Sequence, residues 1–390
     1  MIKRIILLLL ILALFASLFG CTSNTQEKKA EVRSIEQQLA SSESKPAEKN
    51  TALSKPDVSN NTAVSSASNS SENPQAALAN KTVSDSEPAQ PKDTPKSAKP
   101  GETLRFIVMA DSRGVDKGVN SKIVKQTLEQ IKKLSPQPKF AVLPGDLVDG
   151  AATYAEVKSM LQYFKKITTA YYPSSFFFPG FGNHEARAKL DGEKAFSEVF
   201  NDFKANFMPN TNRTVYYFDS GNTRFYMLNS NHPGETHTIS DKQLEWVKSN
   251  SDGSQKYNMF FFHEPAYPTG SHVGSALDSN RLQRNKLWQL IDGFKSPMVF
   301  VGHEHNYTRR HIDSSFNETV KGTSFKFTKS IYQVTVGSFG APLYNKYTST
   351  KNVDVPPVTQ YHYSVVDIDD KGIKVTVYSV DGKIIDSFAQ

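Results

Sequence analysis

The chain is 390 residues long and 38% hydrophobic, which is enough apolar material for a large buried core, and its formal net charge is +7. That charge would attract anionic substrates but is too small to indicate nucleic-acid binding, and no run of Lys and Arg with interleaved aromatic residues stands out. The single cysteine, Cys21, excludes a disulfide framework within the chain.

The N-terminal segment has the pattern of a secretory signal peptide. Residues 1–4 carry two basic side chains, and residues 5–18 form an almost unbroken apolar run, short for a membrane span of about 20 residues. The run leads into Leu18-Phe19-Gly20-Cys21, which looks like a bacterial lipobox, where the cysteine is acylated and becomes the new N-terminus. We therefore expect residues 1–20 to be a signal peptide, and a lipid on Cys21 to anchor the protein to a membrane outside the cytoplasm, at the cell surface or in the periplasm. An uncleaved N-terminal anchor is the alternative.

Residues 21–100 are expected to be a lipidated, disordered linker. Ser, Ala, Asn, Lys, Glu and Pro dominate them, and large apolar residues are almost absent, so they cannot bury enough surface to offset the entropy of ordering. Residues 101–390 are rich in aromatic residues and contain no second linker and no internal repeat. We expect them to form one domain, near the upper size of a single core.

The domain begins by alternating buried strand patterns with amphipathic helix patterns. Three strands are each followed by a polar motif and a helix, which is the order of an α/β fold. We expect strands at 104–110, 140–144, 175–179, 214–220, 224–230, 257–262 and 296–301, and helices at 120–134, 153–169, 193–207, 240–247 and 280–291. Beyond residue 307, alternating patterns predict strands at 324–327, 331–336, 361–368, 373–378 and 383–388.

Polar groups that suit metal ions follow many of these strands. In chain order they are Asp111, Asp146, Asn183 with His184, His263, and His303 with His305. Ligands of open sheets bind at the carboxyl ends of strands, and histidines two residues apart in an extended segment point to the same side. Because neutral histidine is a common ligand for Zn, Fe, Ni and Cu, we expect a metal site where these strand ends meet.

Over residues 104 to about 307, these motifs resemble the signature of the calcineurin-like metallophosphoesterases. The family pattern is Asp-x-His, Gly-Asp-x-x-Asp, Gly-Asn-His-(Asp/Glu), a lone His and Gly-His-x-His, and four of the five blocks match in order. The resemblance implies a four-layer α/β sandwich, with two mixed β-sheets flanked by helices. It also implies a dinuclear centre of divalent or trivalent ions, for which Mn, Fe and Zn are all open.

The resemblance assigns roles to the strand-end residues. The first ion would be held by Asp111, Asp146 and His305, and the second by Asp146, Asn183, His263 and His303. Two cations about 3.5–4 Å apart need a shared anionic ligand to limit their repulsion, which is the role implied for Asp146. His184 would be the catalytic histidine, and Asp149 the carboxylate that orients it.

The first motif departs from the family, because Arg113 stands where a ligating histidine is usual. Arginine stays protonated and has no lone pair for a metal, so the first site would be one ligand short. The planar guanidinium suits phosphoryl oxygens, and we favour Arg113 as a phosphate clamp in the catalytic set. A structural ion pair is the alternative.

We therefore predict an extracytoplasmic, lipid-anchored enzyme that hydrolyses a phosphoester with a metal-bound hydroxide in a dinuclear site. One alternative is a non-catalytic or single-metal surface-binding protein that keeps the fold. Another is a phosphodiesterase acting on nucleotides or nucleic acid. Glu185 and Glu304 are either groups behind the ligands or solvated loop residues. Histidines without a motif are not expected in the site; these are His237, His272, His311 and His362.

Overall fold

The computed structural model describes residues 103–390. The expected signal peptide, residues 1–20, and the expected linker, residues 21–100, lie outside the described residues, so the lipid on Cys21 stays a prediction. Within the described part of the chain, no helix is long and apolar enough to cross a membrane.

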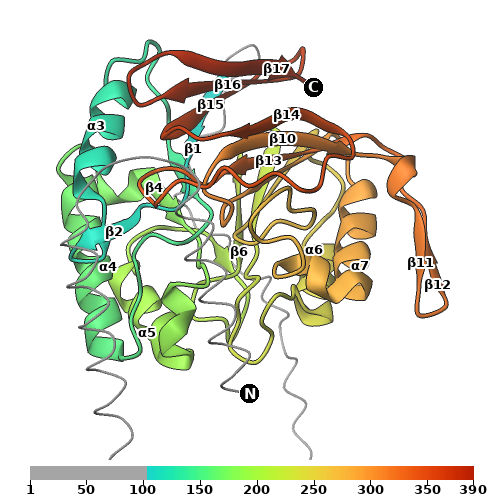
Figure 1. Ribbon diagram of the computed structural model, residues 1–390, viewed down its shortest axis with the longest axis horizontal. Helices are drawn as coiled ribbons and strands as arrows, with labels where there is room; N and C mark the ends of the chain where they lie inside the picture. Colours follow the sequence, from blue (N-terminus) through green and yellow to red (C-terminus); the bar gives the residue numbers. More distant parts are fainter. Residues whose placement is uncertain (1–102) are drawn as a thin grey trace, which may run out of the picture. The chain divides into compact units, whose positions relative to one another are not determined.

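Two mixed β-sheets form the centre of the fold (Figure 1). The first has six strands in the order β17-β16-β15-β1-β3-β4, in which β1, β3 and β4 run parallel and the other neighbours are antiparallel. Its strands are β1 (Leu104–Val108), β3 (Ala141–Leu143), β4 (Phe177–Pro179), β15 (His362–Ile368), β16 (Ile373–Ser379) and β17 (Ile384–Ala389).

The second sheet has eight strands in the order β14-β10-β13-β9-β8-β7-β6-β5, and the run from β13 to β7 is parallel. Its strands are β5 (Asn206–Phe207), β6 (Tyr216–Ser220), β7 (Thr223–Met227), β8 (Tyr257–Phe262), β9 (Pro297–Val301), β10 (Tyr307–Ile312), β13 (Ile331–Val336) and β14 (Val353–Val358). Outside both sheets lie the short strand β2 (Arg113–Asp116) and a hairpin of β11 (Glu318–Val320) and β12 (Thr323–Phe325).

Helices cover the outer face of each sheet, which completes four layers (Figure 1). The helices are α3 (Ser121–Ile131), α4 (Tyr154–Thr169), α5 (Leu190–Val199), α6 (Asp241–Ser249) and α7 (Arg281–Asp292). The first three bury their apolar sides with the six-stranded sheet, and α6 and α7 bury theirs with the eight-stranded sheet. This arrangement confirms the predicted four-layer α/β sandwich.

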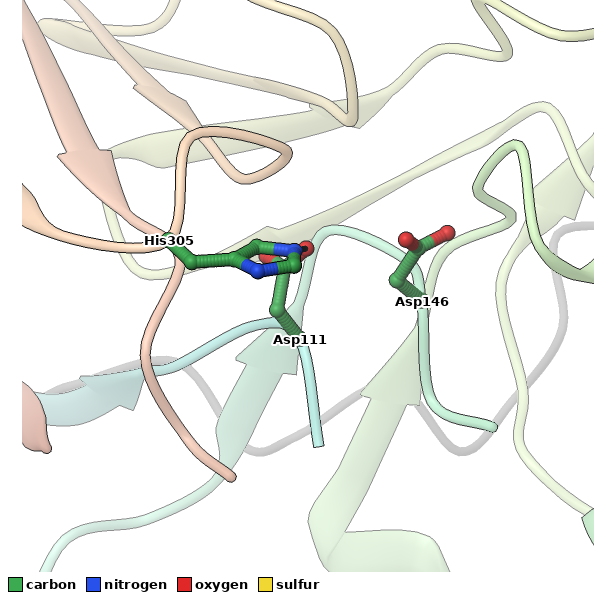
Figure 2. A group of neighbouring side chains, drawn as sticks. All are labelled: Asp111, Asp146 and His305. Carbon is green, nitrogen blue, oxygen red and sulfur yellow. Dashed lines mark ion pairs between the residues drawn. The ribbon is translucent and has the colours of Figure 1, made fainter. Parts of the chain in front are cut away.

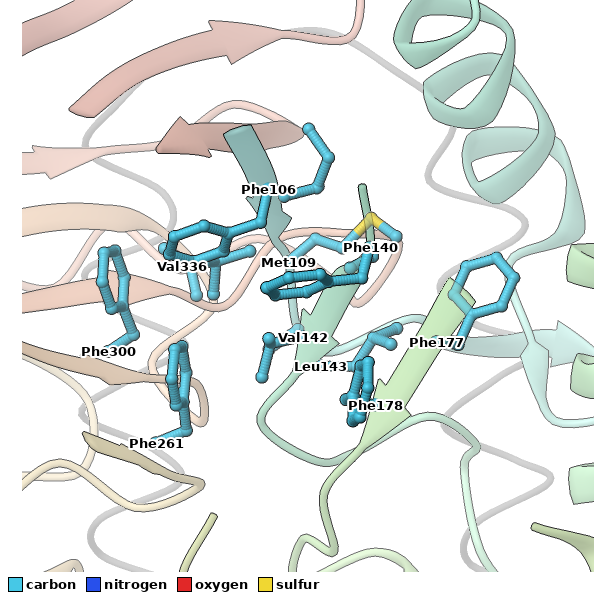
Figure 3. Packing of buried hydrophobic residues seen from close by; sticks show 14 of the residues in the cluster. Phe106, Met109, Phe140, Val142, Leu143, Phe177, Phe178, Phe261, Phe300 and Val336 are labelled. Atoms are coloured by element: carbon cyan, nitrogen blue, oxygen red, sulfur yellow. The ribbon is translucent and has the colours of Figure 1, made fainter. Parts of the chain in front are cut away.

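Aromatic side chains join the two sheets at their facing sides (Figure 3). The rings of Phe106 and Phe140, from the first sheet's side, meet the Phe225 ring edge-on at 5.1 and 5.2 Å between centroids. Along β8, Phe261 points into this core, whereas Phe260 and Phe262 point outward to the cluster beneath α6 and α7. Strands buried on both faces read as continuous apolar runs, which is why Tyr257–Phe262 was predicted at its observed bounds.

Parts of the fold differ from the sequence expectation, among them one helix end and two strands of the eight-stranded sheet. The helix expected at 193–207 ends at Val199, because the aromatic residues beyond it pack toward the sheet instead: Phe203 and Phe207 lie 5.1 and 5.7 Å from the Tyr216 ring. Strand β10 was missed because its mixed sequence lacks an apolar run. Strand β14 was also missed; it contains two prolines, which a sheet edge tolerates because one side needs no partner.

Candidate metal centre

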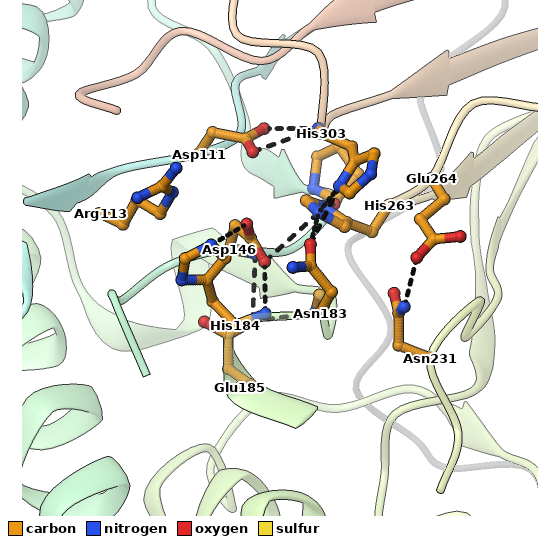
Figure 4. Close-up of polar contacts among 12 residues, drawn as sticks. Asp111, Arg113, Asp146, Asn183, His184, Glu185, Asn231, His263, Glu264 and His303 are labelled. Carbon is orange, nitrogen blue, oxygen red and sulfur yellow. Dashed lines mark hydrogen bonds and ion pairs between the residues drawn. The ribbon is translucent and has the colours of Figure 1, made fainter. Parts of the chain in front are cut away.

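The strand ends meet as the sequence predicted. Asp111, Asp146 and Asn183 follow β1, β3 and β4 of one sheet, whereas His263 and the pair His303 and His305 follow β8 and β9 of the other. The carboxyl ends of these parallel strands therefore face one another across the junction of the two sheets, where open α/β sheets bind their ligands. Figure 4 draws most of these side chains in one cluster.

One group of donors is formed by Asp111, Asp146 and His305 (Figure 2). Each is buried, and one ligand atom from each lies within 4.8 Å of the others. His305 Nε2 is 3.4 Å from an Asp111 carboxylate oxygen. Its Nδ1–H donates to the Pro342 carbonyl at 2.6 Å, which leaves the Nε2 lone pair facing the carboxylates.

A second group consists of Asn183, His263 and His303. The Asn183 Oδ1 lies 2.9 Å from both His263 Nε2 and His303 Nδ1, and the two ring nitrogens are 3.2 Å apart. Because His263 Nδ1–H donates to the Pro144 carbonyl at 3.0 Å, Nε2 is the nitrogen that offers a lone pair when the ring is neutral. Lone-pair atoms this close repel one another unless a proton or a cation lies between them, so the second group also fits a metal ion.

Asp146 connects the two groups. It belongs to the first by distance, and its Oδ1 lies 3.3 Å from His263 Nε2 of the second. Burial alone would raise the pKa of Asp146, but the adjacent His263 holds that pKa below its usual range. Conversely, burial lowers the pKa of His263, yet the carboxylates of Asp146 and Asp111 raise it to about 10. The carboxylates thus produce a field that attracts positive charge, which divalent cations would satisfy.

The backbone is strained at three of the expected ligands. Asp111, Asp146 and His303 have φ values of 62°, 51° and 70°, a left-handed region that non-glycine residues rarely adopt. Neighbouring glycines allow the close packing: a Cβ on Gly182 or Gly302 would collide with the Asp146 or Asp111 carboxylate, respectively. Such outliers gather at functional sites, where the surrounding structure imposes them.

Two buried glutamates hold the ligand loops in place. The Glu185 carboxylate accepts hydrogen bonds from the backbone N–H groups of Asp146, Val148 and Gly182 at 3.1, 3.0 and 2.9 Å. Glu304 accepts three more at 2.8–3.2 Å from the backbone of residues 270–272. Both are fully buried. Of the two interpretations left open by the sequence, these contacts favour groups behind the ligands over solvated loop residues.

The three residues predicted for catalysis lie beside the donors. His184 is 6% exposed, and its Nε2 lies 3.7 Å from Asp146 Oδ2. Its Nδ1–H donates at 2.7 Å to the backbone carbonyl of Asp149, while the Asp149 carboxylate is farther away at 3.4 Å. Arg113 forms an ion pair with that carboxylate at 3.3 Å and donates to the Tyr344 hydroxyl at 3.2 Å. Asp149 thus contacts His184 mainly through its main chain, a role the sequence did not predict.

Two site residues were missed by sequence reasoning. His272 was expected outside the site, which is wrong: its ring centroid is 3.8 Å from that of His303, and burial, together with His305 and His263, lowers its pKa to about 4. The Tyr344 ring stacks on His305 at 4.1 Å. Both residues lie in loops without periodicity or a motif, so no local signal marked them.

Comparison with known proteins bears on this arrangement. A family model described as calcineurin-like phosphoesterase matches residues 104–307, just over half of the chain. No match was found among curated proteins. A purple acid phosphatase from yellow lupin (Lupinus luteus) seeds superposes with a TM-score of 0.58 at 16% identity, covering 75% of this chain and 55% of the lupin protein. The chain thus spans about half the length of that relative. The structure of PhoD superposes with a TM-score of 0.54 at 10% identity, covering 76% of this chain and 74% of PhoD. At these identities the likeness establishes a shared fold.

Proposed function

Because this chain belongs to the calcineurin-like phosphoesterase family, we propose that its buried carboxylates and histidines hold two metal ions and hydrolyse a phosphoester there. The family match bears out the prediction of a phosphoesterase. The observation that carries the dinuclear proposal is that Asp146 lies within reach of two separate donor groups. One buried carboxylate placed between two sets of lone pairs is what a pair of cations requires.

The donors divide naturally between the ions. Asp111 and His305 would hold the first ion with Asp146, and the amide oxygen and two imidazoles of the second group would hold the other. When bound, such ions supply Lewis acidity toward phosphoryl oxygens and lower the pKa of water toward neutrality. Carboxylate, imidazole and amide oxygen donors suit Mn, Fe and Zn. Because Arg113 occupies the place of a further ligand, the first site has three protein donors, and it would bind its ion more weakly.

The remaining polar groups are suited to act on the substrate. His184, held by its Nδ1–H on the Asp149 carbonyl, presents Nε2 for proton transfer to the departing oxygen. Burial lowers the pKa of His184, which makes its imidazolium a stronger acid and leaves a smaller share of the ring protonated near neutral pH. Arg113 lies against Asp149 and Tyr344 with part of its side chain exposed, and we assign its guanidinium to the phosphoryl oxygens. The ion pair with Asp149 orients the Arg113 side chain, and it is compatible with a contact between the guanidinium and a phosphoryl oxygen.

Elemental analysis combined with hydrolysis of an activated aryl phosphate tests the proposal. We expect about two ions per wild-type chain, loss of one in His305→Ala or Asn183→Ala, and loss of both in Asp146→Ala. His184→Ala should keep its metal and lose about 10²–10⁴-fold in turnover. His311→Ala is the control, because the His311 ring forms a hydrogen bond with Asp354, which is not one of the expected metal ligands. A folded, metal-loaded wild type without turnover would instead favour a non-catalytic surface-binding protein.

Two finer points need separate experiments. Comparing aryl phosphate monoesters with diesters and cyclic nucleotides distinguishes a phosphatase from a phosphodiesterase. We also propose that a lipid on Cys21 anchors the enzyme outside the cytoplasm, supported by the apolar run and the lipobox-like sequence. Cys21→Ser should abolish metabolic labelling with a radioactive fatty acid and release the protein from the membrane fraction. Retention of both label and membrane association would contradict the anchor.

A further inference from the structure

A cationic cleft of about 280 Å³ lies apart from the candidate metal centre, and none of the six expected metal ligands lines it. Sites for drug-sized molecules commonly have volumes of roughly 300–1,000 Å³, so this cleft, just below that range, suits a smaller ligand such as an oxyanion. Four cationic side chains line it, against two carboxylates. The cations are Arg281, Arg284, Arg310 and Lys351, and the carboxylates are Asp278 and Glu318.

Arg310 is the least compensated of these cations. It is 2% exposed, and no carboxylate within residues 103–390 forms an ion pair with it. Its Nη atoms donate to the backbone carbonyls of Tyr267, Pro268 and Lys351 at 3.0, 3.1 and 2.5 Å, and its Nε has no partner in the described part of the chain. Burial lowers the pKa of Arg310 to about 10. A buried charge without a counter-charge is costly, and an anion in the cleft would offset that cost.

The two carboxylates are already engaged. Glu318, on the β11–β12 hairpin beside α7, pairs with both Arg281 and Arg284 and accepts from Asn285 Nδ2 at 2.7 Å (Figure 1). Asp278 accepts from backbone N–H groups at 2.7 and 3.2 Å within its own turn. One carboxylate shared by two arginines therefore leaves an excess of positive charge.

The start of α7 adds to that excess. Arg281 and Arg284 lie in its first turn, which contains no acidic residue. The positive end of the helix dipole disfavours cations there and favours anions. A bound anion would therefore stabilise the guanidinium groups of Arg281 and Arg284 at this position. An aromatic contact also orients one of these arginines. The Arg284 guanidinium lies 4.5 Å from the centre of the Tyr267 ring, and this contact restricts the orientation of the guanidinium plane.

We propose that this cleft binds an oxyanion of the phosphate class. Guanidinium groups match the geometry of phosphate oxygens, and three arginines converge here, two from α7 and one from β10. The ligand is either free inorganic phosphate or the phosphoryl group of a larger molecule, whose organic part would lie against Tyr267 and Phe316. This site is independent of the proposed hydrolytic centre.

Isothermal titration calorimetry of inorganic phosphate into the full, metal-loaded chain tests the proposal. We expect a saturable binding event that Arg281→Gln weakens about tenfold, the effect of losing one charge-assisted hydrogen bond. Glu318→Gln should instead tighten that event, because it frees two arginines and removes a repelling charge. Lys383→Gln makes the same change of charge as Arg281→Gln on an exposed side chain of the β16–β17 turn, and it should leave binding unchanged.

The opposite signs of the two cleft variants separate ligand binding from a structural role. If the arginines only fasten the hairpin to α7, both variants lower the melting temperature and neither alters phosphate binding, which would overturn the proposal. Phosphate bound at the metal centre forms a second event that Asp146→Ala removes and the cleft variants leave unchanged, so the two proposals fail independently. Glucose 6-phosphate distinguishes the sources: tighter binding than phosphate indicates a phosphorylated compound, and weaker binding indicates the free ion.

Discussion

Glu185 offers a test of how far the candidate centre depends on residues that do not touch the metal. Its carboxylate accepts from three backbone N–H groups, two in the loop after β3 and one in the loop after β4. Replacing Glu185 by Gln keeps the size of the side chain but exchanges one acceptor oxygen for an N–H₂ group. The perturbation therefore changes one hydrogen-bond acceptor and removes the charge of the carboxylate, and it leaves every expected ligand in place.

The structure gives the expected size of the effect. The Oε2 atom of Glu185 accepts hydrogen bonds from the N–H groups of Asp146 and Gly182, and its Oε1 atom accepts one from the N–H of Val148. A glutamine would retain the first two bonds and set its N–H₂ group against the Val148 N–H, so that the Val148 N–H loses its acceptor and two donor groups face each other. An unsatisfied buried group costs about 1–3 kcal/mol, which we expect as the loss in free energy of unfolding. Loops that hold metal ligands less firmly typically bind metal about 10–100-fold more weakly.

Urea denaturation and metal titration of Glu185→Gln measure the two effects separately. Glu129→Gln is the matched control, since Glu129 is exposed and, among residues 103–390, its carboxylate accepts only from the Tyr171 hydroxyl at 3.2 Å. Lower stability with unchanged metal affinity would mean that Glu185 supports the fold without positioning Asp146. If neither quantity changes, the reasoning from unsatisfied donors is refuted.

Three further substitutions probe the site, a helix end and the core. Gly182→Ala should weaken metal binding by about 10–100-fold because its Cβ would displace Asp146, whereas Gly253→Ala, in open space at φ +70°, should cost only about 1 kcal/mol of stability. Thr153→Ala removes the cap of α4, so urea denaturation should detect a loss of about 1 kcal/mol with turnover unchanged. Phe225→Ala opens a cavity between the sheets and should cost about 3–5 kcal/mol by the same assay; a loss below 1 kcal/mol would contradict the packing described.

The parts of the fold that could be predicted are those in which local sequence and burial agree. Strand β8 is apolar on both faces because both faces are buried, so its bounds follow from composition alone. Helix α4 was found at its observed start because Thr153 caps it and accepts from the Glu156 N–H. The residues expected to bind metal could be brought together in the same way, since each lies within four residues after the end of a strand and offers a carboxylate, imidazole or amide oxygen.

The parts that could not be predicted depend on how distant segments come together. His272 belongs to a loop with no periodicity, and only the folded path of that loop brings its ring against His303. Likewise, Tyr344 reaches His305 from a segment without regular structure. Asp149 illustrates a second limit, because a sequence motif identifies a side chain and gives no indication that the main-chain carbonyl is the closer partner.

Backbone strain and carboxylate repulsion at the candidate metal centre would both be offset by bound cations. Asp111, Asp146 and His303 each hold a left-handed backbone conformation, which costs of order 1–3 kcal/mol apiece. The two aspartates also place carboxylates with ligand atoms within 4.8 Å of each other in a buried setting, where like charges repel strongly. Hydrogen bonds from backbone N–H groups to Glu185 and Glu304 hold the loops but add no positive charge. Cations would relieve the repulsion and contribute binding free energy to the folded state, so the loop geometry that is strained is also the geometry that would bind metal.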